Sequence, residues 1–147
     1  MALVSAGSDD SGMEPYSILV AEDDPELCEL IRERLVRGGH NPICVKDGAE
    51  AIEVARRTSI DVVVTDVLMP RKDGHEVINF LRNGNSGARI VAITGEGGEF
   101  EREINLTIAQ TLGAHSVLLK PFRMDELLAA VEAALADRRP RGTVKFG

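Results

Sequence analysis

Short apolar runs alternate with amphipathic stretches along most of this chain, and no other feature of the sequence constrains its fold as strongly. Five runs are rich in β-branched residues, which favours strands; they lie at 18–22, 43–45, 60–65, 89–94 and 115–119. After each run, apolar residues recur at the three- and four-residue spacing of a helix. The expected helices lie near 25–37, 48–57, 74–83, 100–112 and 127–135. Five such strand-then-helix units predict a doubly wound α/β fold, in which helices cover both faces of a parallel sheet.

The chain has 147 residues, which is a usual size for one domain. We expect this domain over 16–138, between flexible tails at 1–15 and 139–147. The first tail is rich in Ser, Gly and Asp, and the second contains Arg, Pro and Gly. Aromatic residues are scarce, with four Phe, one Tyr and no Trp, so the core must be built from aliphatic side chains.

Charge and hydropathy exclude several classes of protein. The formal net charge of −7 argues against general binding to nucleic-acid phosphates, which needs a basic surface. No stretch is long and apolar enough to span a membrane, and the first residues lack the pattern of a signal peptide. Cys28 and Cys44 lie in segments with a core-facing pattern, and the chain has no CxxC pair. We therefore expect a cytoplasmic protein with two reduced thiols.

Polar residues stand where the expected strands end: Glu22 and Asp23, Asp66, Thr94 and Lys120. In an open parallel sheet, ligands bind beyond these ends, at the point where the strand order reverses. With strand order 2-1-3-4-5, the first and third strands are neighbours, which brings Asp23 close to Asp66. Clustered carboxylates repel unless a cation joins them, and oxygen ligands without His or Cys favour Mg²⁺. The alternative interpretation is a set of solvated loop acids.

The third acid of this segment, Asp24, fits a different role. It can cap the first helix, and Pro25 suits the first helical turn. Leu27, Ile31 and Leu35 follow at four-residue spacing and line one helical face. We therefore expect Asp24 to start the helix rather than to bind the cation.

A carboxylate beside Mg²⁺, with a hydroxyl and a lysine facing it, can accept a phosphoryl group. Carboxylates act as nucleophiles in aspartyl-phosphate chemistry. Mg²⁺ and a lysine offset the charge of the transferring group, and a hydroxyl holds one of its oxygens. An enzyme of the Mg²⁺-dependent phosphatase type is disfavoured, because the first strand ends in EDDPE and carries no DxD motif.

Five motifs occur in order over 16–138: ILVAEDD, VVVTDVLMP, RKDG, AITG and LLKPF. In these motifs the chain resembles the receiver domain of bacterial two-component response regulators. The resemblance implies the flavodoxin-like fold with strand order 2-1-3-4-5. It also implies a domain that accepts a phosphoryl group from the histidine of a sensor kinase or phosphotransfer protein. Such a domain catalyses its own phosphorylation and dephosphorylation and then switches its protein–protein interactions.

The resemblance also assigns roles to single residues. It implies that Asp66 is the phosphoacceptor, that Thr94 is the switch hydroxyl and that Lys120 pairs with the phosphate. It implies a Mg²⁺ site made by Glu22, Asp23, Asp66 and the backbone carbonyl of Leu68. The bond from Lys120 to Pro121 is implied to be cis, and Gly74 to serve the loop after the third strand.

The chain departs from the family pattern at two places. Val117 stands where the family has a switch aromatic, so either the relay is altered or another side chain, Phe100 or His115, takes part. The loop at 95–103 is longer than usual and borders the expected site. These departures leave open a second hypothesis, a binding module on the same fold that does not depend on phosphorylation.

The partners follow from the resemblance and from the length of the chain. We expect a histidine kinase or phosphotransfer protein as donor and a downstream protein target. After residue 138 only a short tail remains, which predicts a single-domain regulator without a DNA-binding domain and without a membrane partner, unless the chain is a fragment of a longer protein. Formation of a homodimer on phosphorylation stays open.

Overall fold

One parallel sheet organises the part of the chain that the computed structural model describes, residues 15–66, 76–77, 87–94, 103, 106–107, 110 and 113–136. Its strands are β1 (Ser17–Ala21), β2 (Asn41–Val45), β3 (Val62–Asp66), β4 (Arg89–Thr94) and β5 (Ser116–Leu119). Every pairing between them is parallel, and the order across the sheet is β2-β1-β3-β4-β5. The predicted strands and the predicted 2-1-3-4-5 order are confirmed.

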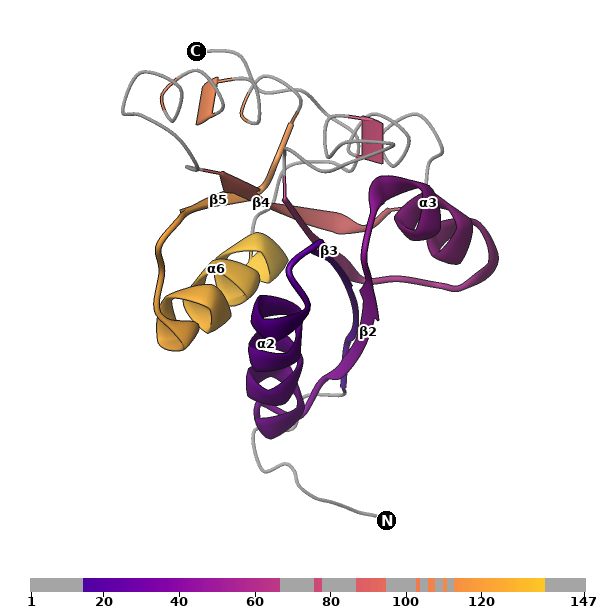
Figure 1. Cartoon of the computed structure of the whole chain (residues 1–147), viewed down its shortest axis with the longest axis horizontal. Coiled ribbons are helices and arrows are strands. Elements are labelled where there is room, and N and C mark those ends of the chain that lie inside the picture. Colours follow the sequence, from indigo (N-terminus) through magenta and orange to yellow (C-terminus); the bar gives the residue numbers. More distant parts are fainter. Residues whose placement is uncertain are drawn as a thin grey trace.

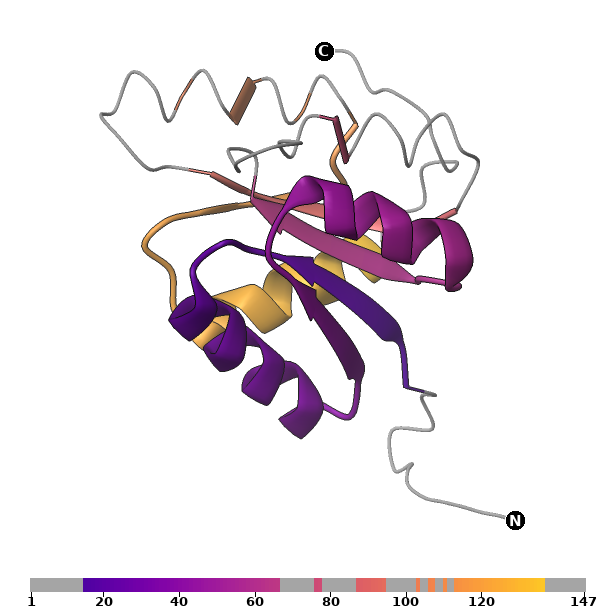
Figure 2. The same cartoon turned by 45° about the vertical axis from the view of Figure 1, so that its right-hand side comes forward.

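Helices cover both faces of this sheet (Figure 1). The helices are α2 (Pro25–Arg37), α3 (Gly48–Arg57) and α6 (Met124–Ala136). α2 and α6 lie side by side against one face, and α3 lies against the other, as the turned view of Figure 2 also shows. These positions agree with the helices expected near 25–37, 48–57 and 127–135. The helices expected at 74–83 and 100–112 fall mostly outside the described residues, as do the two expected tails apart from residue 15.

The core consists of two aliphatic layers, one on each side of the sheet. Side chains that alternate along β1, β3 and β4 point into opposite layers, so these strands are buried on both faces. The layer under α2 and α6 contains Ile18, Val64, Ile31, Leu35 and Leu127. The layer under α3 contains Leu19, Val63, Ala92, Ala51 and Ile52. A core without large aromatic side chains was predicted from the composition, and the buried residues fit it.

The start of α2 separates Asp24 from the acids before it. One Asp24 carboxylate oxygen accepts hydrogen bonds from the backbone N–H groups of Glu26 at 3.0 Å and Leu27 at 3.4 Å. Pro25 occupies the first turn, where its missing N–H leaves no helical hydrogen bond unmade. The predicted helix cap is therefore confirmed.

A glycine ends the same helix. Gly39 has a φ angle of +89°, a conformation that side chains with a Cβ rarely adopt. This turn lets the N–H of His40 donate to the carbonyl of Leu35 at 3.0 Å, which satisfies one of the last carbonyl groups of α2. The chain then enters β2, the edge strand next to β1.

The two cysteines differ in exposure. Cys28, on α2, is buried, whereas Cys44, on β2, is exposed. The prediction of core-facing cysteines is correct for Cys28 and wrong for Cys44, because an edge strand is covered incompletely by α2. Among the described residues, no helix is long and apolar enough to cross a membrane.

Removal of the α2 cap tests the role of Asp24. We expect Asp24→Ala to lower the free energy of unfolding by about 1 kcal/mol, because two backbone N–H groups lose their acceptor. Asp24→Asn keeps a side-chain oxygen at the same place and should cost much less. Urea denaturation of the three proteins measures both effects, and equal stability of the Ala variant and the wild type would contradict this role.

Candidate functional site

Three carboxylates meet at the carboxyl edge of the sheet. Glu22 and Asp23 directly follow β1, and Asp66 is the last residue of β3. β1 and β3 are hydrogen-bonded neighbours whose last register pair is Ala21 with Thr65, so the chain delivers both segments to one point. One carboxylate oxygen from each of the three acids lies within 4.8 Å of the others. Glu22 and Asp66 are buried, whereas Asp23 is exposed.

Lys120 reaches this cluster from the end of β5. Its Nζ lies 2.8 Å from Oδ2 of Asp66 and 3.5 Å from Oε1 of Glu22. The Lys120 side chain is 13% exposed, so water screens these two ion pairs only weakly. The backbone N–H of Lys120 donates to the carbonyl of Thr94 at 2.7 Å, which ties the end of β5 to the end of β4. The peptide bond from Lys120 to Pro121 is cis, as the resemblance implies.

Two buried oxygens at this edge accept or donate no hydrogen bond within the part of the chain that the structure describes. They are Oγ1 of Thr94 and Oε1 of Glu22, in residues that are 3% and 1% exposed. Oε1 of Glu22 lies in an ion pair with Lys120, whereas its other oxygen accepts the N–H of Asp24 at 3.1 Å. Buried polar atoms without a partner cost free energy, which favours a ligand that completes them.

Burial changes the protonation of Glu22. Desolvation is the main cause that raises the pKa of Glu22 from 4.5 to about 7. The N–H of Asp24 and the charge of Lys120 lower this pKa, and the neighbouring carboxylate of Asp66 raises it further. A cation beside the cluster would favour the charged form.

The donor set fits a hard divalent cation. All candidate ligands among the three acids are carboxylate oxygens, which Mg²⁺ prefers. In the described part of the chain, Lys120 contacts two of the three carboxylates, so a divalent cation would offset the remaining negative charge. The site can therefore hold Mg²⁺ next to Asp66.

The structure places most of the predicted site residues together. It brings together five of them: Glu22, Asp23, Asp66, Thr94 and Lys120. Leu68, Gly74 and Phe100 lie outside the described residues, as does the predicted loop at 95–103 except for residue 103.

Val117 and His115 occupy structural positions on either side of the start of β5. Val117 is partly buried in the layer under α3 and pairs in register with Ala92. The Nδ1 atom of the His115 ring accepts the backbone N–H of Ile90 at 3.0 Å, and the backbone N–H of His115 donates to the Ile90 carbonyl at 2.7 Å. His115 is thus held at the amino end of the strand, away from the acids at the carboxyl end.

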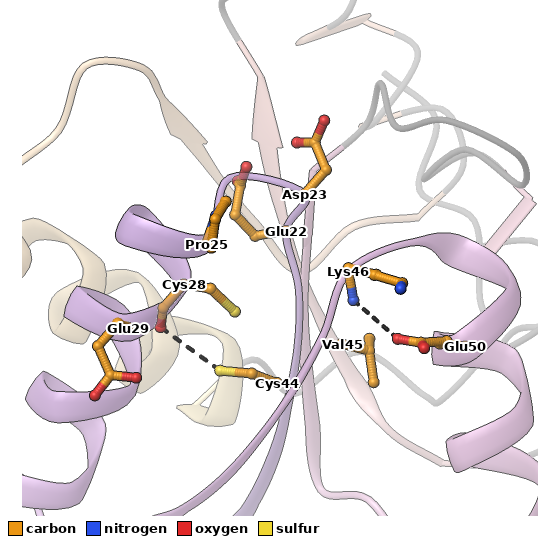
Figure 3. Close-up of a pocket in the computed structure, with 9 residues that line it drawn as sticks. All are labelled: Glu22, Asp23, Pro25, Cys28, Glu29, Cys44, Val45, Lys46 and Glu50. Atoms are coloured by element: carbon orange, nitrogen blue, oxygen red, sulfur yellow. Dashed lines mark hydrogen bonds between the residues drawn. The ribbon is translucent and has the colours of Figure 1, made fainter.

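A hollow of about 410 Å³ adjoins the acidic cluster, and the sequence did not predict it (Figure 3). Glu22, Asp23 and the first turns of α2 form one wall, and Cys44, Val45 and Lys46 at the end of β2 form another. The predicted strand order could have indicated this, because it places the carboxyl end of β2 beside that of β1.

Comparison with known proteins agrees with this geometry. The family described as response regulator receiver domain matches residues 18–132. Response regulator MprA of Mycobacterium sp. (strain KMS) is 36% identical over 126 residues, which cover 86% of this chain and 53% of that protein. Transcriptional regulatory protein CpxR of Escherichia coli (strain K12) is 36% identical over 118 residues, which cover 80% of this chain and 48% of that protein. This chain therefore spans about half the length of these curated relatives.

A solved structure adds a metal to the comparison. The receiver domain of sensor histidine kinase PA1611 from Pseudomonas aeruginosa PAO1 matches with a TM-score of 0.72 and 27% identity. The match covers 84% of this chain and 99% of that domain. That structure is described as having a magnesium ion coordinated in the active site cleft.

The comparisons correct the prediction about partners. The prediction of a single-domain regulator without a DNA-binding domain is wrong. The relatives are response regulators about twice as long as the matched region, and CpxR is named a transcriptional regulatory protein. The short segment after residue 138 does not define the output of such a protein.

The raised pKa of Glu22 predicts a pH-dependent loss of stability in Mg²⁺-free buffer. The folded protein keeps the Glu22 proton up to about pH 7, whereas the unfolded chain loses it near 4.5, so stability falls as pH rises through this window. Glu22→Gln mimics the protonated form and should be more stable than the wild type at pH 8, by up to about 3 kcal/mol, and nearly equal to it at pH 4.5.

Chemical denaturation of both proteins with a chelator present, from pH 4.5 to 8, measures this difference. Glu33→Gln is the matched control, because Glu33 is exposed on α2 and away from the cluster. A stability difference between Glu22→Gln and wild type that stays constant with pH would contradict the raised pKa.

Proposed function

Because the chain belongs to the response regulator receiver domain family, we propose that it accepts a phosphoryl group on Asp66 and thereby switches its contacts with other proteins. The proposed donor is the phosphorylated histidine of a sensor kinase or phosphotransfer protein, acting in the cytoplasm. The observation that carries this proposal is the 2.8 Å contact between Lys120 Nζ and Oδ2 of the buried Asp66, beside the buried Glu22. A lysine in this position both orients the carboxylate and meets the charge of an incoming phosphoryl group.

Asp66 acts as the nucleophile in this proposal. One carboxylate oxygen of Asp66 forms the new bond to phosphorus while the bond from phosphorus to the donor nitrogen breaks, and the donor imidazole keeps the electron pair and takes up a proton. Lys120 moves its contact from Asp66 to a phosphoryl oxygen. The Thr94 hydroxyl donates a hydrogen bond to another phosphoryl oxygen. This hydroxyl has no hydrogen-bond partner in the described part of the chain.

The proposed metal site lies beside the nucleophile. Glu22, Asp23 and Asp66 would hold Mg²⁺ through carboxylate oxygens, with the backbone carbonyl of Leu68 as a further proposed ligand. When bound, Mg²⁺ offsets the negative charge shared by the acids and the phosphoryl group. The magnesium ion in the Pseudomonas receiver domain supports this assignment. The chain itself then promotes both gain and loss of the phosphoryl group, without turning over a separate substrate.

Phosphorylation with a small donor tests the assignment of Asp66. Incubated with acetyl phosphate and Mg²⁺, the wild type should gain one phosphoryl group per chain by intact mass, and Asp66→Asn should gain none, because an amide is not a nucleophile here. Asp23→Asn should raise the Mg²⁺ concentration for half-maximal rate by about tenfold or more. Asp24→Asn is the matched control, because it changes a neighbouring acid that caps α2.

Two results would contradict this proposal. A phosphoryl group that persists on Asp66→Asn would remove Asp66 as the acceptor. A wild type that stays unmodified by acetyl phosphate and by phosphorylated histidine donors would remove the phosphoacceptor function itself.

Thr94 offers a test that separates function from stability. Thr94→Val removes a buried hydroxyl that has no hydrogen-bond partner in the described part of the chain, so the free energy of unfolding should stay equal or rise. The same change should slow phosphorylation by about 10- to 100-fold, because one donor to the phosphoryl group is lost. Urea denaturation and the acetyl phosphate assay give the two readouts, and a marked loss of stability with an unchanged rate would contradict this role.

A further inference from the structure

Two cysteines line the hollow beside the acidic cluster. Cys28 lies on the first turns of α2 and Cys44 near the end of β2, and the Cys44 side chain reaches toward Cys28 (Figure 3). The Cys44 thiol donates to the backbone carbonyl of Cys28 at 3.5 Å. Both cysteines are free, and both line the same hollow. The fold thus brings the two cysteines into contact although 16 positions separate them.

The two thiols have different environments. Cys44 is exposed, whereas Cys28 is 7% exposed. The interaction with the Cys28 side chain is the main cause that lowers the pKa of Cys44, and the charge of Arg32 lowers it further, although burial opposes both. The same interaction and burial raise the pKa of Cys28. Cys44 is therefore the thiol that an external oxidant meets first and the better nucleophile of the two.

We propose that Cys28 and Cys44 form a redox-active dithiol that closes to an intramolecular disulfide between α2 and β2. This site is separate from the phosphoacceptor chemistry and does not depend on it. The accessible Cys44 is the attacking thiol, and the buried Cys28 is the resolving thiol. The oxidant is a low-molecular-weight disulfide such as glutathione disulfide.

The reaction proceeds by two thiol–disulfide exchanges. The Cys44 thiolate attacks one sulfur of glutathione disulfide, which forms a mixed disulfide and releases one glutathione thiolate. The Cys28 thiolate then attacks the Cys44 sulfur and releases the second glutathione. The protein loses two electrons and two protons, and glutathione disulfide is reduced to two glutathione thiols. Where the thiol pool is reducing, the bridge would be reversed by the same steps, so the pair would report the redox state.

The disulfide would link the start of α2 to β2 beside the acidic segment. Glu22 and Asp23 line the same hollow as the two cysteines. The segment from Glu22 to α2 is short, and the N–H of Glu22 donates to the carbonyl of Val45, the residue after Cys44, at 3.1 Å. Oxidation would therefore act on elements that hold the acidic segment in place.

Thiol counting on the full chain tests the proposal. The reduced protein is incubated with glutathione disulfide, the remaining thiols are alkylated with a maleimide, and the products are analysed by intact mass and by non-reducing peptide mapping. We expect the loss of both thiols, a monomeric product without bound glutathione and a cross-linked peptide pair that contains Cys28 and Cys44. Dithiothreitol should return both thiols. This readout involves no phosphoryl donor, so its outcome is independent of the proposed function.

Single-cysteine variants identify the order of attack. Cys28→Ser should trap glutathione on Cys44, because the resolving thiol is missing, and Cys28→Ala serves as a second variant if the buried serine affects folding. Cys44→Ser should leave Cys28 reduced under the same conditions. A wild type that keeps both thiols, carries glutathione on each cysteine or forms a covalent dimer would overturn the proposal.

Discussion

The parallel pairing of β1 with β3 is the constraint on which the candidate site depends. Because the two strands run in the same direction and in register, their carboxyl ends deliver Glu22, Asp23 and Asp66 to one point. Both strands are buried on both faces, so the charged residues can occur only where the strands end. The same hydrophobic burial that stabilises the sheet thus holds three carboxylates together against their repulsion.

The described residues offset the repulsion within this cluster only in part. Lys120 pairs with Asp66 and approaches Glu22, and the N–H of Asp24 binds the second oxygen of Glu22. Within the described residues, these contacts leave Oε1 of Glu22 and Oγ1 of Thr94 without a hydrogen bond, and burial raises the pKa of Glu22. Sites that bind charged ligands commonly carry such unmet groups in the ligand-free state, because the ligand completes them. A cation and a phosphoryl group bound at this edge of the sheet would supply partners for these buried oxygens and offset the charge of the carboxylates.

Sequence patterns predicted the helices, the strands and their order, whereas individual side-chain contacts between distant segments became visible only in the structure. The α2 cap by Asp24 was predictable because the acceptor and the donors lie within three residues. The meeting of Glu22, Asp23 and Asp66 followed from the order and direction of the strands. The ion pair of Lys120 with Glu22 depends on side-chain conformations across the sheet, which no spacing encodes. Cys44 was assigned to the core because its segment is apolar, and its exposure follows from the position of β2 at the edge of the sheet.

The backbone provides a link from Thr94 to the surface that needs no aromatic side chain at position 117. Thr94 pairs in register with Leu119, and its carbonyl accepts the N–H of Lys120 at 2.7 Å. Leu119 is one of the large hydrophobic residues exposed in the described part of the chain, at 36%. A displacement of Thr94 toward a phosphoryl group would therefore pull directly on the end of β5, while Val117 stays packed in the layer under α3. In this chain, the pairing of β4 with β5 would transmit such a movement of Thr94 to the exposed Leu119.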